Sequence, residues 1–266
     1  MPYLSPVQNV MVSAARKAGR RLSRDFNEVE NLQISMKGPA DFVTNADHRT
    51  EQMLIEELQR ARPGYGFLVE ESGVIEGPDK THRWIIDPLD GTTNFLHGIP
   101  QFAISIALER DGQIVSALVF NPVSNELFLA EKGHGAYLND KRLRVANRKK
   151  MNESLFATGI PFLGRGDHDH YIRELSAVMG TTSGVRRFGA ASLDLAFTAA
   201  GRVDGFWEHG LSPWDVAAGI LLVREAGGVV TDFGGGTDMI GRREIVCANE
   251  ALHPQLLKLI REAGKA

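Results

Sequence analysis

Two short apolar runs that end abruptly on acidic side chains constrain the fold of this chain more than any other feature. Residues 66–69 lead directly into Glu70 and Glu71, and residues 84–86 lead directly into Asp87. Apolar runs of this length predict buried strands. Ligands bind beyond the carboxyl ends of strands in α/β proteins. If the two strands run in the same direction, these acids therefore predict a single site where the strands end.

The segment after the second run carries more acids and hydroxyls than an ordinary turn needs. It reads Asp87-Pro88-Leu89-Asp90-Gly91-Thr92-Thr93. Proline fixes the turn, glycine lets the backbone approach a ligand, and amides at a helix start favour an anion. Clustered carboxylates repel one another unless they share protons or bind cations, and Mg²⁺ prefers oxygen ligands and phosphate. The segment as a whole predicts metal-assisted phosphoryl transfer, although each dipeptide alone favours a solvated turn.

Size and composition favour an ordinary globular protein with a large core. The 266 residues are 43% hydrophobic and 24% charged, and the net charge is −3. A nucleic-acid or membrane partner would favour a concentrated basic surface, and no stretch approaches the ~20 apolar residues of a membrane-spanning helix. The single cysteine, Cys247, cannot form an internal disulfide and lies in an apolar run. We therefore expect a buried thiol and a cytoplasmic location.

The hydrophobic pattern predicts an α/β chain with mixed α+β character in two halves. Ser5-Pro6 predicts the start of an amphipathic helix, which we favour over a transit peptide for the arginine-rich N-terminus. A strand at 42–44 and a helix from Asn45 follow. An antiparallel meander is predicted at 103–108, 114–120 and 126–130. After a polar stretch at 147–153, strands are predicted at 154–158, 229–231 and 244–248, and helices at 171–179, 193–200, 213–226 and 254–263. We place the boundary at residue 146, which divides the chain into residues 1–146 and 147–266.

Three polar features have ordinary structural interpretations. Asp215 follows Ser212-Pro213-Trp214 and could simply cap a helix. The run Asp167-His168-Asp169-His170 resembles a transition-metal cluster, but it lies in a predicted loop, and surface polarity is the favoured interpretation. The basic run at 148–150 is predicted to be a linker or a solvated surface turn. Contact with nucleic acid or transcription factors therefore has no support in the residues themselves.

Residues 87–95 match every position of a signature of the inositol monophosphatase family, Asp-Pro-(Ile/Leu)-Asp-Gly-Thr-Thr-Asn-Phe. The chain therefore resembles that family. Further segments resemble other family elements, namely residues 41–47, 70–72, 189–194 and 214–219. Order and spacing agree from about residue 10 to about residue 260. The chain departs from the pattern at Val69, where the family often has a small residue, and around Lys37, to which we assign no role.

The resemblance implies a role for each matching residue. The metal ligands would be Glu70, Asp87, Asp90, Asp215 and the carbonyl of Leu89, and they would hold two to three Mg²⁺ ions, with Asp90 bridging two of them. Thr92 and Asp47 would position and deprotonate the attacking water, and Glu70 would act with the metal beside them. The amides of Gly91, Thr92 and Thr93 would hold the phosphate. Ala191 and Glu208 would line the sugar pocket, and Glu70, Asp90 and Asp215 would also border the substrate.

The same resemblance implies a layered αβαβα sandwich in two packed halves, with the site between them. It implies a Mg²⁺-dependent phosphatase acting on a small sugar or polyol phosphate, with myo-inositol monophosphate as the leading substrate, in a homodimer. Alternatives within the enzymes are phosphatases of fructose 1,6-bisphosphate, histidinol phosphate or a 3′-phosphonucleotide. A regulatory protein of transcription antitermination is the alternative from another class, because some bacterial members that take part in it resemble this chain.

Overall fold

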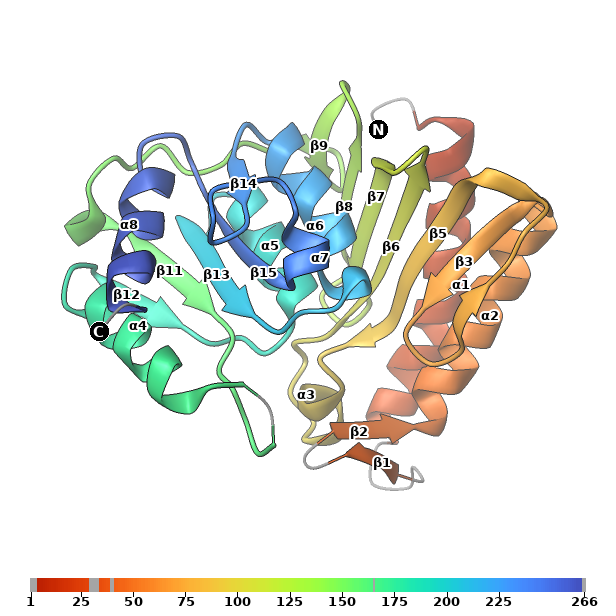
Figure 1. Cartoon of the computed structure of the whole chain (residues 1–266). Helices are drawn as coiled ribbons and strands as arrows, with labels where there is room; N and C mark the ends of the chain where they lie inside the picture. Colours follow the sequence, from red (N-terminus) through yellow and green to blue (C-terminus); the bar gives the residue numbers. More distant parts are fainter. Residues whose placement is uncertain (1–3, 29–33, 39–40, 165, 265–266) are drawn as a thin grey trace.

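The structure, a computed structural model, describes residues 4–28, 34–38, 41–164 and 166–264, of which 34–38 and 41–43 are described as backbone only. Its helices and sheets lie in five layers (Figure 1). Two outer helices, α1 (Pro6–Asn27) and α2 (Asn45–Ala61), pack on an eight-stranded sheet. The central layer is α5 (Ala191–Ala199) and α6 (Pro213–Glu225), which separate this sheet from a five-stranded one. On the far side lie α4 (His168–Met179) and α8 (His253–Ala263), which confirms the αβαβα sandwich.

The eight-stranded sheet has the strand order β10-β9-β8-β7-β6-β5-β3-β4. Its strands are β3 (Tyr65–Val69), β4 (Gly73–Ile75), β5 (Asp79–Asp90), β6 (Ala103–Arg110), β7 (Gln113–Asn121), β8 (Glu126–Glu131), β9 (Gly135–Leu138) and β10 (Lys141–Arg142). The predicted meander is confirmed as β6, β7 and β8, which pair antiparallel. One correction concerns β5, which was predicted to end at residue 86. It continues to Asp90 because Asp87 pairs with Ser105 and Asp90 with Ala103.

The five-stranded sheet has the order β12-β11-β13-β15-β14. Its strands are β11 (Leu155–Thr158), β12 (Gly184–Arg186), β13 (Gly205–His209), β14 (Val229–Thr231) and β15 (Glu244–Ala248). The remaining short elements are β1 (Ile34–Gly38), β2 (Asp41–Thr44), α3 (Thr92–Leu96), a 3₁₀ turn (Met151–Glu153) and α7 (Met239–Arg242). Cys247 is buried in β15 as a free thiol, as predicted, and burial raises the pKa of that thiol to about 12.

The large sheet buries both faces, and side-chain size differs between them. Small side chains such as Ala103, Ala107 and Ala117 face α5 and α6, whereas Ile104 and Leu118 face α1 and α2. Successive residues of a strand point to opposite faces, so this alternation follows from the sequence. Alanines let the central helices lie close to the sheet, and this close packing holds the site-bearing ends of both elements in place.

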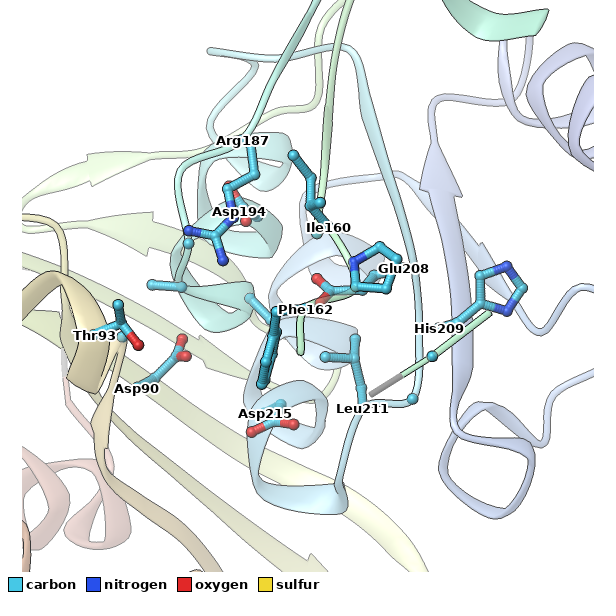
Figure 2. Close-up of a pocket in the computed structure, with 18 of the residues that line it drawn as sticks. Asp90, Thr93, Ile160, Phe162, Arg187, Asp194, Glu208, His209, Leu211 and Asp215 are labelled. Atoms are coloured by element: carbon cyan, nitrogen blue, oxygen red, sulfur yellow. The ribbon is translucent and has the colours of Figure 1, made fainter. Parts of the chain in front are cut away.

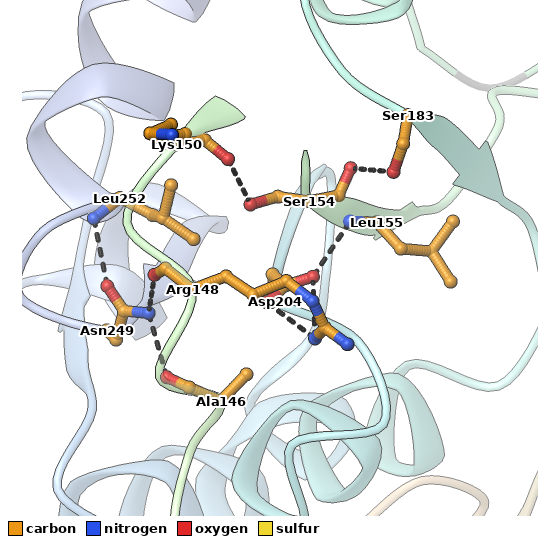
Figure 3. Close-up of polar contacts among 9 residues, drawn as sticks. All are labelled: Ala146, Arg148, Lys150, Ser154, Leu155, Ser183, Asp204, Asn249 and Leu252. Atoms are coloured by element: carbon orange, nitrogen blue, oxygen red, sulfur yellow. Dashed lines mark hydrogen bonds and ion pairs between the residues drawn. The ribbon is translucent and has the colours of Figure 1, made fainter. Parts of the chain in front are cut away.

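The polar connection between the two halves is anchored rather than loose (Figure 3). Asn249 Nδ2 donates to the carbonyls of Ala146 and Arg148 at 2.8 Å each. The Arg148 guanidinium pairs with Asp204, a buried carboxylate that also accepts a hydrogen bond from Leu155 N at 2.8 Å. Arg148 therefore has an internal partner, which fits the linker interpretation. The division at residue 146 stays a prediction, and one hydrophobic cluster runs continuously across it.

No described helix combines the length and the apolar character that crossing a membrane requires.

Candidate active site

The pairing of β3 with β5 brings the acids at their ends together. The two strands are parallel, with Val69 opposite Ile86, so Glu70 and Asp87 follow at the same edge of the sheet. This confirms the strand direction on which the predicted convergence depends. Leu89 N donates to Asp87 Oδ1 at 2.9 Å, and this bond tightens the end of β5 so that Asp90 comes to the same edge.

A cavity of about 320 Å³ lies beside these acids, between the two halves of the chain. All predicted site residues except Asp47 line it, namely Glu70, Asp87, Leu89, Asp90, Gly91, Thr92, Thr93, Ala191, Glu208 and Asp215. Figure 2 shows Asp90 and Thr93 on one wall, and Glu208 and Asp215 on the other. Segments far apart in sequence are thus brought to one pocket.

Asp90 is bound to the second half of the chain. Its Oδ2 accepts hydrogen bonds from both the backbone N–H, at 2.7 Å, and the hydroxyl of Ser192, at the start of α5. Asn94 of α3 makes a second link, because its side-chain amide donates to the carbonyls of Gln101 and Phe188 at 2.7 Å each. These bonds fix the turn after β5 against α5.

Asp215 combines the two interpretations that the sequence left open. It occupies the third position of α6, and its Oδ2 accepts a hydrogen bond from Ser212 N at 2.7 Å, so it does cap the helix. Its carboxylate also lies close to that of Asp87, whose pKa the charge of Asp215 helps to raise. Two carboxylates can approach in this way only when they share a proton or have a cation between them. This contact supports a cation site, while the ligand role itself stays a prediction.

Thr92 links the cavity to Asp47, which lies just behind its wall. The Thr92 hydroxyl lies 3.1 Å from Asp47 Oδ1 and 3.0 Å from the carbonyl of Leu89. The other oxygen, Asp47 Oδ2, accepts hydrogen bonds from the N–H and the hydroxyl of Thr44, at 2.8 and 2.6 Å, in the capping box of α2. The capping box therefore holds Asp47 with one oxygen directed at the Thr92 hydroxyl.

Gly91 allows the turn before α3 to form. Its φ is 93°, in the left-handed region, and a Cβ at this position would lie 2.9 Å from the carbonyl oxygen of Gln101. A side chain is therefore excluded both by backbone strain and by contact. The turn leaves the amides at the start of α3 beside the carboxylates, as predicted.

Three further residues of the pocket had no site role assigned from the sequence, although Arg187 was considered for contact with substrate or a second subunit, and Asp194 belongs to the segment at 189–194. Gly159 makes room for Glu208, because a Cβ there would lie 1.9 Å from the Glu208 carboxylate carbon. Asp194 is buried in α5 with an Oδ1 that has no hydrogen-bond partner, and Arg187 lines the same wall (Figure 2). A buried acid among the apolar residues of α5 was a signal for Asp194. The sequence offered no signal for Gly159, since only its tertiary neighbour explains it.

Burial and mutual repulsion raise the carboxyl pKa values in this pocket. Burial raises the pKa of Asp90 to about 6, and burial together with the charge of Asp90 raises the pKa of Asp215 to about 8. Burial and the charge of Glu70 raise the pKa of Asp87 well above its usual range. Burial raises the pKa of Glu208 to about 8, although the charge of Arg187 opposes the shift. Oxygen ligands that resist ionisation until a cation arrives fit one or more hard divalent ions.

These shifts predict how stability depends on pH without a metal. Because the pKa values of Asp90 and Asp215 are raised above that of an unfolded aspartate, the folded state holds protons that the unfolded state has lost. The free energy of unfolding should therefore fall as the pH rises from about 4 to about 8. Mg²⁺ should reverse this loss by neutralising the carboxylates, with a gain in Tm that is larger at about pH 8 than at about pH 5 by roughly 5 °C. Calorimetry with EDTA and with Mg²⁺ at the two pH values measures the difference, and an equal gain at both would contradict the account.

Comparison with known proteins gives one family match and several similar relatives. The sequence model of the Inositol monophosphatase family matches residues 3–265. The chain is 58% identical over 258 residues to the inositol-1-monophosphatase of Mesorhizobium japonicum, covering 97% of each chain. It is 43% identical over 259 residues to the Nus factor SuhB of Escherichia coli, again covering 97% of each. The crystal structure of the extragenic suppressor protein suhB from Bartonella henselae is similar with a TM-score of 0.95 and 55% identity, over 97% of this chain and 99% of that one.

Proposed function

The chain belongs to the inositol monophosphatase family, and from this premise we propose that it hydrolyses phosphomonoesters of small polyols, with myo-inositol monophosphate as its leading substrate. One observation carries the proposal. Carboxylates with raised pKa values converge beside a glycine-threonine turn in the lining of one pocket. Such a set of oxygen ligands beside free amides suits a metal ion together with a phosphate group.

We infer that Mg²⁺ binds to Glu70, Asp87, Asp90, Asp215 and the carbonyl of Leu89. The mutual repulsion of the Asp87 and Asp215 carboxylates supports this, because a cation between them would remove that repulsion. Bound Mg²⁺ supplies Lewis acidity, which lowers the pKa of water and neutralises charge on the phosphate. We also propose that the site holds two to three Mg²⁺ ions, as the resemblance to the family implies.

The protein's own residues would handle the proton of the attacking water. Thr92 and Asp47 form a hydrogen-bonded pair that ends at the cavity, and burial raises the pKa of Asp47. A carboxylate with a raised pKa is a better general base, so the pair is suited to orient the water and take up its proton. The amides of Gly91, Thr92 and Thr93 would hold the phosphate oxygens. Cys247 is buried and does not line the pocket, so it is not placed to act as a nucleophile. We therefore propose direct attack by water, without a covalent phosphoenzyme.

The far wall of the pocket would recognise the polyol. Glu208 is half-buried, and both it and Ala191 line the cavity. A carboxylate accepts hydrogen bonds from sugar hydroxyls in defined directions, whereas the alanine leaves space for a ring. Because a site that pairs with a hydroxyl rejects analogues that lack it, this wall would set the preference among phosphate esters.

Glu208→Gln should change selectivity more than catalysis. The amide keeps the size of the side chain but replaces an acceptor oxygen by a donor nitrogen, so KM for myo-inositol 1-phosphate should rise about tenfold or more while kcat changes little. Kinetics with a panel of sugar and polyol phosphates measure the shift. Gln113→Glu, on an exposed strand end, is a control for a change of charge elsewhere on the protein, and it should leave the order of substrate preference unchanged. An unchanged ranking in Glu208→Gln would remove Glu208 from the polyol pocket.

The same panel tests the proposed substrate class. It should contain myo-inositol 1-phosphate, fructose 1,6-bisphosphate, histidinol phosphate and a 3′-phosphonucleotide, each with Mg²⁺. The proposal expects the highest kcat/KM for the inositol ester. A clear preference for any of the other three would keep the metal-assisted chemistry and replace the substrate.

A second role is favoured by the similarity to the Nus factor SuhB of Escherichia coli. A regulatory protein of transcription antitermination needs a binding surface and no catalysis. An Asp90→Asn protein, inactive as a phosphatase, should still bind RNA polymerase-associated factors if this role exists. Retention of purified Nus factors by that variant would support the regulatory role. If the variant retains none of them, only the enzymatic function is supported.

We further infer a cytoplasmic homodimer. The one cysteine is a buried free thiol, which suits a reducing compartment. Exposed apolar side chains outside the pocket lie on the loop after β11 and on α4, namely Leu163 and Ile172. An exposed apolar group of this kind is typical of a protein interface. Light scattering of the purified protein distinguishes a dimer from a monomer, and Leu163→Glu should weaken the dimer if this face forms it.

A further inference from the structure

Three side chains outside the carboxylate cluster converge at the far end of the pocket. His170 Nε2 lies 2.9 Å from Glu174 Oε1, and His209 Nε2 lies 2.9 and 3.1 Å from the two oxygens of the same carboxylate. The three potential ligand atoms all lie within 4.8 Å of one another. Glu174 is completely buried, whereas the side chains of His170 and His209 are 28% and 35% exposed. A buried carboxylate thus has two imidazoles as its ion-pairing partners, and these reach the solvent.

This His–Glu–His cluster is separate from the predicted Mg²⁺ ligands. Glu208 and His209 are neighbours on β13, and successive residues of a strand point to opposite faces. Trp207, two residues before His209, packs with α4 and α8, whereas Phe206 packs on the other face with the central layer. Figure 2 accordingly shows His209 pointing away from Asp90 and Asp215. Glu208 and His209 therefore serve two different sites across one strand.

The chemistry of the cluster differs from that of the carboxylate site. Two imidazoles and one carboxylate are the ligand set of many zinc sites, whereas Mg²⁺ selects oxygen ligands. Bonds of ~2.0–2.1 Å in a tetrahedron place neighbouring ligand atoms ~3.3 Å apart. Both Nε2 atoms lie 2.9 Å from Glu174 Oε1, and the three ligand atoms lie within 4.8 Å of one another, so binding of an ion would need only small side-chain rotations. Water or a group in the cavity could occupy the fourth position, since both imidazoles line the cavity.

The cluster is held in this arrangement by regular structure. His170 and Glu174 are four residues apart on α4 and therefore share one face of the helix. The N–H of His170 donates to the capping Asp167 side chain at 2.9 Å, which fixes the first turn. The His209 ring packs edge-on against Phe233 at 4.2 Å between centroids, and a Cβ on Gly264 would lie 2.8 Å from the His170 ring. Both imidazoles therefore have restricted room to turn away, which favours a preformed site.

We propose that His170, Glu174 and His209 form a second metal site, for a borderline divalent transition ion of the Zn²⁺ class. The ion would replace the hydrogens now shared between the imidazoles and the carboxylate, and it would join α4 to β13 behind the polyol wall of the pocket. Because the ion would join these two elements, it should stabilise the second half of the chain against unfolding. The site is independent of the proposed hydrolysis, because none of its ligands belongs to the Mg²⁺ set or to the Thr92–Asp47 pair.

Metal binding to the Asp90→Asn protein in excess Mg²⁺ tests the proposal, because Mg²⁺ then competes for the remaining oxygen ligands. Equilibrium dialysis with Zn²⁺ should retain one equivalent, and Co²⁺ in its place should show the visible absorption of four-coordinate geometry. His170→Gln and His209→Gln should each weaken Zn²⁺ binding more than about 100-fold, since even outer-shell changes cost 10–100-fold. His168→Gln is the matched control. It lies on the same helix turn, is exposed, and should bind Zn²⁺ like the parent.

Thermal unfolding provides a second readout that does not depend on activity. Zn²⁺ should raise the Tm of the parent and of His168→Gln by several degrees, and it should have no such effect on His209→Gln. Circular dichroism of each variant checks that the fold is retained. The proposal is overturned if the two glutamine variants bind Zn²⁺ as tightly as the parent, or if the parent retains no Zn²⁺ in the presence of Mg²⁺.

Discussion

Asp90→Asn should lower Mg²⁺-dependent phosphate release by at least about 10³-fold while the protein remains folded. The loss is large because the carboxylate lies centrally among the proposed ligands, and metal stabilisation of the reaction is worth several kcal/mol, with ~1.4 kcal/mol for each factor of ten. The fold should persist because an amide oxygen can still accept the hydrogen bonds that Ser192 now donates to Asp90 Oδ2. Phosphate release at saturating Mg²⁺ and the Tm of the variant are the two measurements.

Ser192→Ala is the matched control for this experiment. It removes the hydroxyl that binds Asp90 but keeps the carboxylate and the backbone N–H of residue 192. If charge on Asp90 is what matters, this variant should keep most of its activity. Near-normal turnover in Asp90→Asn, or an equal loss in both variants, would contradict a ligand role for Asp90.

Thr92→Val should lower kcat by about 10²- to 10⁴-fold, the usual contribution of a positioned general-base system. Valine has nearly the shape of threonine but lacks the hydroxyl, which lies 3.1 Å from Asp47 Oδ1 and 3.0 Å from the Leu89 carbonyl. KM should change little, since the backbone amide of residue 92 is kept. Steady-state kinetics with myo-inositol 1-phosphate separate the two constants.

Thr92→Ser tests whether the hydroxyl or the packing is responsible. Serine restores the hydroxyl without the methyl group, so it should recover most of the activity that valine loses. Equal losses in the serine and valine variants would assign Thr92 to packing rather than to the handling of the proton. A rise in KM alone would point to phosphate binding instead.

Much of the fold was predictable because patterns of periodicity and capping act locally. Ser5 caps α1 as the sequence indicated, with Gln8 completing the capping box. The predicted helix at 171–179 instead begins at His168, because the Asp167 side chain accepts the His170 N–H and starts the turn earlier. The same correction moves His170 from a predicted loop onto a helix, where it shares a face with Glu174. The surface interpretation of residues 167–170 therefore fits Asp169, which is exposed, but not His170.

The candidate site was predictable where acids follow strands, and less so where tertiary contacts decide. Glu70 and Asp87 stand at the ends of apolar runs, so the parallel pairing of β3 and β5 could be anticipated. β13 was missed because a glutamate and a histidine at its end interrupt the apolar pattern of a buried strand. Glu208 was found only through the family resemblance, and Gly159 was not found at all. Neither residue stands out until the two segments are packed together.

The account rests on one central claim, that the carboxylates of the pocket hold Mg²⁺ for the hydrolysis of a polyol phosphate. Release of inorganic phosphate from myo-inositol 1-phosphate, followed as Mg²⁺ is added to the EDTA-treated protein, tests it most directly. The account predicts no turnover without the metal, a saturable rise with Mg²⁺, and loss of that rise in Asp90→Asn. Phosphate release that persists in EDTA, or a Mg²⁺ response that Asp90→Asn shares with the parent protein, would contradict it.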